Sequence, residues 1–156
     1  MGISDEIHAD LTLFGNKHTP TSSLSKEIAA RTITCMAPSK TFNLAGLSSS
    51  YVIIPDETMR DKFRTTLDSL HIGMGNIFGS VALEAAYNEG REWLNQLITY
   101  LEGNVEFAID FFKERIPRIK VTKPESTYLL WIDCRELGIA NKKLKDFFVS
   151  ECKLGL

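Results

Sequence analysis

The stretch TITCMAPSKTFNLAGLSSSYVII, residues 32–54, decides the fold class predicted for this chain. It opens with Thr32–Met36, a run rich in β-branched residues that is typical of a buried strand. It closes with Tyr51–Ile54, an apolar run that stops at Pro55 and predicts the next strand. Lys40 lies between the two runs, beside small residues and Ser and Thr hydroxyls.

Outward from this stretch, helical and strand patterns alternate along the chain. Asp56 and Asn76 are the predicted N-caps of two helices. The inner face predicted for the first of them is formed by Phe63, Thr66, Leu67 and Leu70. The other predicted elements are a strand running into a polar segment over 3–14, a loop over 15–23, a helical turn over 24–31, a long helix over 91–115, strands over 119–122 and 128–132, and a helix over 141–152.

Strands separated by helices favour a parallel sheet, so the predicted fold class is α/β. The elements after residue 117 form a smaller α+β piece that is predicted to begin a second domain, with the helix over 91–115 linking the two. The chain has 156 residues, enough for one domain with its own core or for pieces of two.

Composition and charge exclude several classes of function. The chain has 20 acidic and 18 basic residues, which leaves a net charge of −2 and no strong field to attract nucleic acid or anionic lipid. No apolar stretch approaches the ~20 residues of a membrane span, and the N-terminus lacks the apolar core of a signal peptide. The sequence therefore predicts a protein that binds neither nucleic acid nor membrane.

The cysteines also restrict the function. Cys35, Cys134 and Cys152 are widely spaced and odd in number, and no CxxC or His/Cys pair indicates a metal site. We therefore expect no metal ion and three reduced thiols, which suit a cytoplasmic protein.

Two interpretations of Lys40 follow from its neighbours alone. A lysine in a loop is most often an exposed surface residue. A lysine at a strand end can instead form a Schiff base with a cofactor, because small neighbours let a ring approach and hydroxyls can bind a phosphate. Spacing alone does not decide between these interpretations.

The wider pattern consists of three motifs in chain order. They are SDEIH at 4–8, SKTFNLAGL at 39–47 and KPESTYLLWID at 123–133. Together they resemble the fold-type I pyridoxal 5′-phosphate (PLP) enzymes of the class I/II aminotransferase superfamily. Within it, SDEIHAD and APSKTFN resemble the bacterial cystathionine beta-lyases, or C–S lyases, of the MalY/PatB type, and the likeness covers essentially the whole chain after Gly2.

The resemblance implies roles for four residues. Lys40 would be the catalytic residue that binds PLP covalently, and Asp5 would pair with the pyridine nitrogen and keep it protonated. His8 would donate a hydrogen bond to the phenolate oxygen of the ring, where many relatives have a tyrosine, and Ser39 would contact the phosphate. Taken singly, the last three are also consistent with a strand-end carboxylate, a half-buried histidine and a turn residue.

Two positions depart from the family pattern. Many relatives have a phosphate-binding serine three residues before the lysine and an arginine eight residues after it, whereas this chain has Ala37 and Ser48 there. Family members are also considerably longer, so the resemblance implies a fragment. The phosphate-binding loop in the N-terminal part of family members, and the arginine that binds the substrate carboxylate, would lie outside this chain. The implied domains are the C-terminal part of the PLP-binding large domain at 1–90, a linking helix at 91–117 and the start of the small domain at 118–156.

For the parent enzyme, the resemblance implies a PLP-dependent C–S beta-lyase that cleaves sulfur amino acids to pyruvate, ammonia and a thiol. An aminotransferase is the alternative activity, and a non-catalytic interaction or regulatory module is the alternative of another class. The fragment alone is expected to be inactive. Its unpaired strand edges and uncovered apolar faces predict association with itself or a partner, with a homodimer as the expected form.

Overall fold

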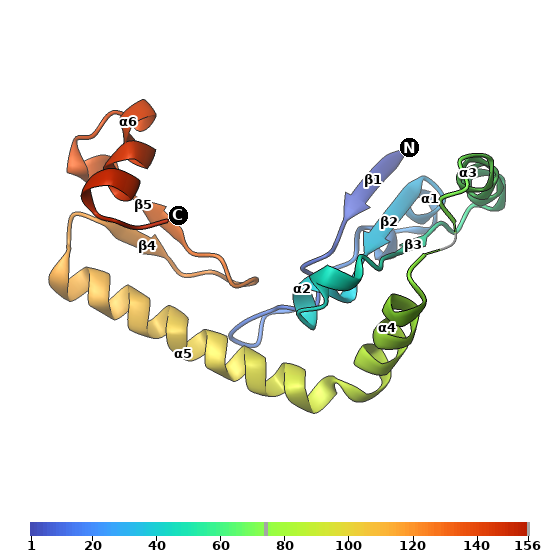
Figure 1. Ribbon diagram of the computed structural model, residues 1–156, viewed down its shortest axis with the longest axis horizontal. Helices are drawn as coiled ribbons and strands as arrows, with labels where there is room; N and C mark the ends of the chain where they lie inside the picture. Colours follow the sequence, from blue (N-terminus) through green and yellow to red (C-terminus); the bar gives the residue numbers. More distant parts are fainter. Residues whose placement is uncertain (74, 156) are drawn as a thin grey trace. The chain divides into compact units, whose positions relative to one another are not determined.

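The computed structural model of this chain describes residues 1–73 and 75–155. Figure 1 traces the elements in chain order. The long helix α5, Arg91–Arg115, contributes residues to two compact units. These units are Met1–Leu101 with Glu125–Tyr128, and Glu102–Pro124 with Leu129–Leu156.

The first unit is built on a three-stranded sheet in the order β1–β2–β3 (Figure 1). Strand β1, Gly2–Asp5, runs parallel to β2, Thr32–Met36, and places Asp5 opposite Cys35. Strand β3, Tyr51–Ile53, runs antiparallel to β2. Both strands predicted for the central stretch of sequence are therefore present, as is the parallel pairing of β1 with β2.

The sheet is mixed, so the prediction of a parallel sheet is wrong for β3. A parallel return needs a crossover of about a dozen or more residues, usually a helix that runs back along the sheet. The connection from β2 to β3 contains the short helix α2, Pro38–Thr41, and a 3₁₀ turn, Ala45–Leu47. Left-handed backbone at Asn43 and Ser48 turns the chain further. These turns reverse the chain at one end of the sheet, and β3 returns beside β2.

The strand predicted to run into a polar segment over 3–14 is β1, which begins at Gly2 and ends at Asp5. The chain then turns, and the Ala9 N–H donates to the Glu6 carbonyl at 2.9 Å. Residues 11–13 pair with a distant segment instead of with β2: the Leu13 N–H donates to the Glu125 carbonyl at 2.9 Å. The residues after Asp5 therefore form a turn and a separate pairing instead of extending β1.

Two helices begin at the predicted caps. The Asp56 carboxylate accepts the Met59 N–H at 2.7 Å at the start of α3, Glu57–Ser69. The Asn76 side chain accepts the Phe78 N–H at 3.0 Å at the start of α4, Ile77–Glu89. The predicted inner face of α3 is only partly confirmed: Phe63 and Leu67 are half-buried, but Thr66 and Leu70 are exposed. The remaining short elements of this unit are a 3₁₀ turn, Thr21–Ser23, and helix α1, Lys26–Ala29.

The second unit contains a two-stranded antiparallel sheet of β4, Lys120–Thr122, and β5, Trp131–Asp133. The second strand starts later than the predicted 128–132 because residues 125–127 pair with 11–13 in the first unit. A 3₁₀ turn, Arg135–Leu137, follows β5. The helix predicted over 141–152 is present as α6, Asn141–Asp146, continued by a π-helical turn, Phe147–Glu151.

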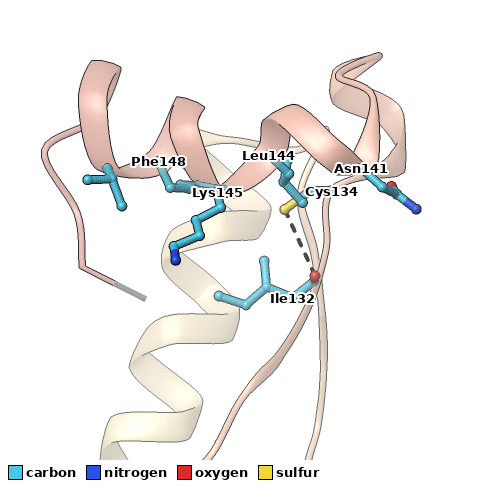
Figure 2. Close-up of a pocket in the computed structure, with 7 residues that line it drawn as sticks. Ile132, Cys134, Asn141, Leu144, Lys145 and Phe148 are labelled. Atoms are coloured by element: carbon cyan, nitrogen blue, oxygen red, sulfur yellow. Dashed lines mark hydrogen bonds between the residues drawn. The ribbon is translucent and has the colours of Figure 1, made fainter.

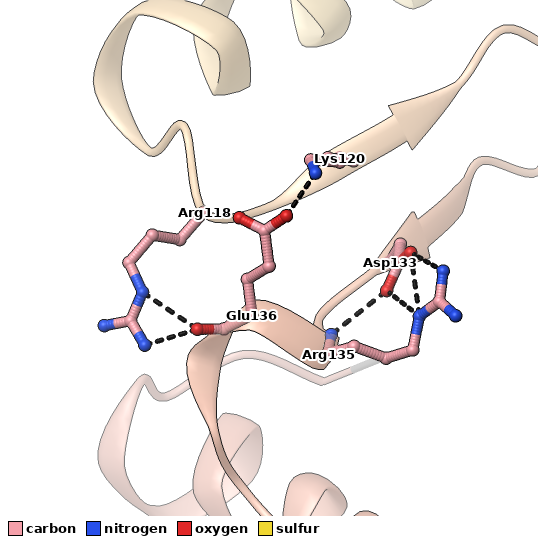
Figure 3. Close-up of polar contacts among 5 residues, drawn as sticks. All are labelled: Arg118, Lys120, Asp133, Arg135 and Glu136. Atoms are coloured by element: carbon pink, nitrogen blue, oxygen red, sulfur yellow. Dashed lines mark hydrogen bonds and ion pairs between the residues drawn. The ribbon is translucent and has the colours of Figure 1, made fainter.

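Charged contacts hold the turn after β5 against the chain around β4 (Figure 3). The Arg118 guanidinium donates to the Glu136 carbonyl at 2.9 Å, and Lys120 pairs with the Glu136 carboxylate. The Arg135 side chain donates to Asp133 at 2.9 Å, and its backbone N–H donates to the same carboxylate at 3.0 Å. These bonds lower the pKa of Asp133 to about 2. All of these residues except the half-buried Asp133 are exposed, so we interpret the cluster as a surface network that contributes little to stability.

Two absences hold for the described part of the chain. None of its helices is both long and apolar enough to cross a membrane. None of its His, Cys, Asp and Glu side chains gather in groups of three that could hold a metal ion.

Candidate active site

The carboxyl ends of β1 and β2 meet at one edge of the sheet, because the two strands are parallel neighbours. Asp5 is the last residue of β1, and α2, which contains Lys40, begins two residues after β2 ends. Open α/β sheets bind their ligands outside the carboxyl ends of the strands. The structure thus brings the segments that carry Asp5 and Lys40 to the edge where such proteins place their sites.

Local sequence explains why Lys40 lies on a helical turn. Ala37 is extended, and Pro38 occupies the first helical position, where a missing N–H costs nothing. The Phe42 N–H donates to the Pro38 carbonyl at 2.8 Å and closes the turn. Pro38 and Thr41 are fully buried, whereas Lys40 is exposed. Because residues three apart share a helix face, the buried pair anchors the turn and leaves the lysine free to meet a ligand.

Asp5 and Glu6 are adjacent acids with different surroundings. Asp5 is exposed, and its carboxylate accepts the Ile7 N–H at 3.3 Å. Glu6 is only 6% exposed. Side chains alternate between the two sides of an extended chain, so a buried residue directly after Asp5 directs the Asp5 carboxylate outward. An outward carboxylate at a strand end can pair with a cationic group of a bound molecule.

Glu6 ties the end of β1 to the loop over 15–23. Its carboxylate accepts the Ser4 hydroxyl at 2.9 Å and the Thr21 N–H at 3.0 Å, and it pairs with His18 Nε2 at 2.7 Å. Burial by itself raises the pKa of Glu6, but the hydrogen bonds from His18, Thr21 and Ser4 outweigh burial and hold the pKa below its ordinary value of 4.5. The sequence offered no role for His18; the structure makes it a partner of Glu6.

The contacts of Glu6 predict that the stability of the fold decreases in acid. Because the pKa of Glu6 is lower in the folded than in the unfolded chain, the carboxylate stabilises the fold fully above the unfolded pKa. This stabilisation is lost as the pH falls through the folded value. Glu6→Gln is expected to lower the free energy of unfolding at neutral pH by about 1–2 kcal/mol and to flatten its decline in acid. Urea unfolding followed by circular dichroism measures both effects.

The control is Glu106→Gln, which changes an exposed glutamate of α5. It should retain the acid dependence of the unchanged chain. An acid profile in Glu6→Gln that matches the unchanged chain contradicts the role assigned to this carboxylate.

His8 has an unsatisfied buried nitrogen at this edge. Its ring packs against the Tyr128 ring at a centroid distance of 5.7 Å. Its Nδ1 atom is buried and has no hydrogen-bond partner among the described residues. Leaving a buried polar atom unpaired costs about 1–3 kcal/mol, so such an atom often marks a place where a ligand binds. An imidazole nitrogen here can form a hydrogen bond with a polar atom of a bound molecule.

Ser39 lies beside the lysine, half-buried in α2, and its carbonyl accepts the Leu44 N–H at 3.1 Å. At the two positions that depart from the family pattern, neither residue supplies a positive charge that could bind a phosphate. Ala37 is a buried methyl group, and Ser48 is a neutral residue with left-handed backbone at φ 50°. A phosphate contact from Ser39 stays a prediction.

Nothing in the sequence indicated that Tyr128 would lie beside His8. The segment before it was predicted as a plain connection between two strands, but the Thr127 N–H donates to the Leu11 carbonyl at 2.8 Å. Thr127 also has left-handed backbone, with φ 70°. A left-handed threonine is uncommon and has no local sequence signal that announces it. Together these features bring Tyr128 to His8.

A pocket in the second unit has different chemistry (Figure 2). It measures about 450 Å³ and is lined by Ile132, Cys134, Asn141, Leu144, Lys145, Phe148 and Val149. Cys134 is 8% exposed, and burial, aided by the negative charge of Asp133, raises the pKa of its thiol. A protonated buried thiol is a poor nucleophile. The pocket is therefore an apolar seam between β5 and α6, and the sheet edge of the first unit is the better candidate site.

Comparison with known proteins gives the context of this edge. The family model described as aminotransferase class I and II matches residues 1–153. Cystathionine beta-lyase PatB of Bacillus subtilis is 45% identical over 152 residues, which are 97% of this chain and 39% of that protein. Protein MalY of Escherichia coli is 30% identical over 155 residues, which are 99% of this chain and 39% of that protein.

A solved structure gives the same picture. Cystalysin from Treponema denticola, whose crystal structure contains a pyridoxal 5′-phosphate cofactor, superposes with a TM-score of 0.93 at 37% sequence identity. The match covers 97% of this chain and 39% of cystalysin. The chain thus spans about two fifths of the length of the relatives that it matches.

Proposed function

This chain belongs to the aminotransferase class I and II family, and we propose that it is part of a PLP-dependent C–S beta-lyase acting on sulfur amino acids. The expected fold is confirmed: the chain has part of the PLP-transferase architecture of fold type I. The main observation in support of this function is that Asp5 and the segment with Lys40 lie at the same edge of the sheet. The names of relatives such as cystathionine beta-lyase PatB support this reaction over other reactions of PLP enzymes.

In this proposal, PLP bound at the edge supplies an aromatic ring that accepts electrons from the amino acid. Lys40 would hold the cofactor through its side-chain amine, and the same amine would take the proton from Cα of the amino acid. Asp5 keeps a proton on the pyridine nitrogen, because a neighbouring negative charge favours the protonated form. The electron pair left at Cα would then form a double bond to Cβ as the sulfur group leaves and takes up a proton to become the thiol. Water would hydrolyse the remaining carbon–nitrogen bond to give pyruvate and ammonia.

His8 and Ser39 complete the proposed cofactor contacts. The unpaired Nδ1 of His8 supports a hydrogen bond to the ring oxygen of the cofactor. Ser39 offers its hydroxyl to the phosphate from a position next to Lys40. Since Ala37 and Ser48 add no positive charge, the remaining phosphate contacts are proposed to come from residues outside this chain.

The reaction products test this proposal. The test uses a full-length family member that contains this segment. Supplied with cystathionine and PLP, it should release pyruvate, ammonia and a thiol. Exchange of amino groups that depends on a keto acid would identify an aminotransferase instead, an alternative that the family description favours. Failure to do either would support the non-catalytic interaction module. The chain by itself is proposed to be inactive.

Assembly, domain limits and location are also proposed. Large apolar side chains lie exposed on α4 and α5, among them Ile77 at 80% and Phe107 at 71%. Such surfaces favour association, and we propose a homodimer. We retain the division into a large-domain part at 1–90, a linking helix at 91–117 and the start of a small domain at 118–156. The three free cysteines support a cytoplasmic location.

A further inference from the structure

The Asp10 carboxylate, which is not one of the proposed cofactor contacts, bonds to the residue that follows Lys40. Asp10 follows β1 at a distance of five residues from Asp5. One of its oxygens, Oδ2, accepts the Thr41 hydroxyl at 3.2 Å and the Tyr87 hydroxyl at 3.2 Å. Thr41 is the residue directly after Lys40, and Tyr87 lies on α4. Asp10 therefore joins three chain segments next to the lysine.

The Thr41 bond is costly to lose because Thr41 is 0% exposed. A buried hydroxyl without a partner cannot recover its hydrogen bond from water. Burial, the neighbouring Tyr51 hydroxyl and the negative charge of Asp10 raise the pKa of Tyr87 well above its ordinary value. The phenol therefore keeps its proton at all ordinary pH values and remains a donor to the carboxylate.

Aromatic packing also holds the turn that contains Lys40. The Phe42 ring lies 5.3 Å from the Tyr87 ring and 6.0 Å from the Trp93 ring, measured between centroids. Gly90 permits this approach, since a Cβ atom there would lie 2.7 Å from Phe42 Cε1. The two residues that follow Lys40 are thus fixed by hydrogen bonds and by ring contacts that converge on Tyr87.

We propose that Asp10 is a positioning residue: through Thr41 and Tyr87 it fixes α2 and so directs the Lys40 amine toward the sheet edge where β1 ends. The consequence for cofactor binding rests on the proposed function. The fixing of α2 does not, because it concerns contacts within this chain. The two parts can therefore be tested separately.

The first test measures how often α2 opens. The Phe42 amide, which donates to the Pro38 carbonyl, reports this opening through hydrogen exchange of the 156-residue chain. Thr41→Val keeps the side-chain shape and removes the donor. It is expected to speed exchange at Phe42 by about tenfold, the scale of one lost hydrogen bond to a charged acceptor. Thr41→Ser keeps the donor and should restore slow exchange, and Asp10→Ala should reproduce the effect of Thr41→Val.

The chain supplies a matched control at Thr34. This residue of β2 is 3% exposed, and its hydroxyl is buried without a hydrogen-bond partner among the described residues. Thr34→Val makes the same chemical change at a buried site where no bond is lost. Exchange at Phe42 should stay at the rate of the unchanged chain. Unchanged exchange in Thr41→Val overturns the proposal.

The second test concerns the lysine. The chain is mixed with PLP below saturation and treated with borohydride, and the label at Lys40 is measured by mass spectrometry of its peptides. Thr41→Val and Asp10→Ala should carry about tenfold less label than the unchanged chain, while Thr34→Val and Thr41→Ser should match it.

Full labelling in Thr41→Val, with faster exchange, overturns the claim that the network directs the amine. If the unchanged chain carries no label at Lys40, the proposed cofactor role fails in this chain. The fixing of α2 is then decided by the exchange result alone.

Discussion

Lys40→Ala is expected to abolish the covalent attachment of PLP and, in a full-length parent protein, to reduce lyase turnover by at least about a thousandfold. Alanine removes the only atom at position 40 that can bond to the aldehyde of the cofactor. It also removes the base proposed for the Cα proton, so binding and chemistry are lost together. The measurement is the visible absorption band that PLP gains when it bonds to a lysine, followed by the mass of the chain after borohydride reduction.

The control for this substitution is Lys62→Ala. Lys62 is an exposed lysine of α3 and has no proposed role. It should leave the band and the labelled mass unchanged. If the band persists in Lys40→Ala, another lysine holds the cofactor and the proposed site is wrong. A small and equal reduction of the band in both variants would indicate unspecific attachment to surface amines.

Patterns within single elements were sufficient to predict much of this fold. The β-branched run Thr32–Met36 is strand β2, and the long helix predicted over 91–115 is α5. The caps Asp56 and Asn76 were predictable because a side-chain oxygen at a helix start satisfies a nearby N–H within the same few residues. Each of these features is decided by neighbours close along the chain.

Features that depend on distant residues could not be predicted in this way. The direction of β3 depends on left-handed turns at Asn43 and Ser48, which are not residues that require such backbone. The late start of β5 depends on pairing between residues 11–13 and 125–127, more than a hundred positions apart in the sequence. Local propensity has no information about such partners.

The candidate site shows the same limit. Asp5, His8, Ser39 and Lys40 were predicted through motifs that resemble a family. The residues behind them were not, because Glu6 with His18 and Asp10 with Tyr87 meet only in the folded chain. Glu6 secures the segment of Asp5, and Asp10 secures the turn of Lys40. Two of the four proposed cofactor contacts, Asp5 and Lys40, are thus each supported by a buried or half-buried carboxylate, which is how a rigid scaffold holds reactive groups in place.

The same substitution at two glycines is expected to have opposite effects on stability. Gly79→Ala should lower the free energy of unfolding by about 2–3 kcal/mol. Gly103→Ala should raise it by about 0.5–1 kcal/mol. Both glycines lie within helices, Gly79 in α4 and Gly103 in α5. The difference therefore reports what surrounds each position.

Gly79 is buried against the loop after α2. A Cβ atom there would lie 1.9 Å from Ser49 Oγ and 2.9 Å from the Leu47 carbonyl oxygen. The serine side chain can rotate away, but the carbonyl belongs to the backbone and also accepts a hydrogen bond from the Asn76 side-chain Nδ2 at 3.2 Å. Alanine at position 79 must therefore push α4 away from the loop. At Gly103 no atom lies within 4 Å of the added carbon, so alanine only reduces the freedom of the unfolded chain.

Urea unfolding of both variants measures the two effects, and Ser49→Ala added to Gly79→Ala separates the two clashes. Removing the serine oxygen should recover part of the loss, while the clash with the Leu47 carbonyl keeps the rest. Full recovery would mean that the backbone contact is relaxed in solution. A Gly79→Ala variant as stable as the unchanged chain would mean that α4 does not pack on this loop, and the contact between Tyr87 of α4 and Asp10 would then lose its structural basis.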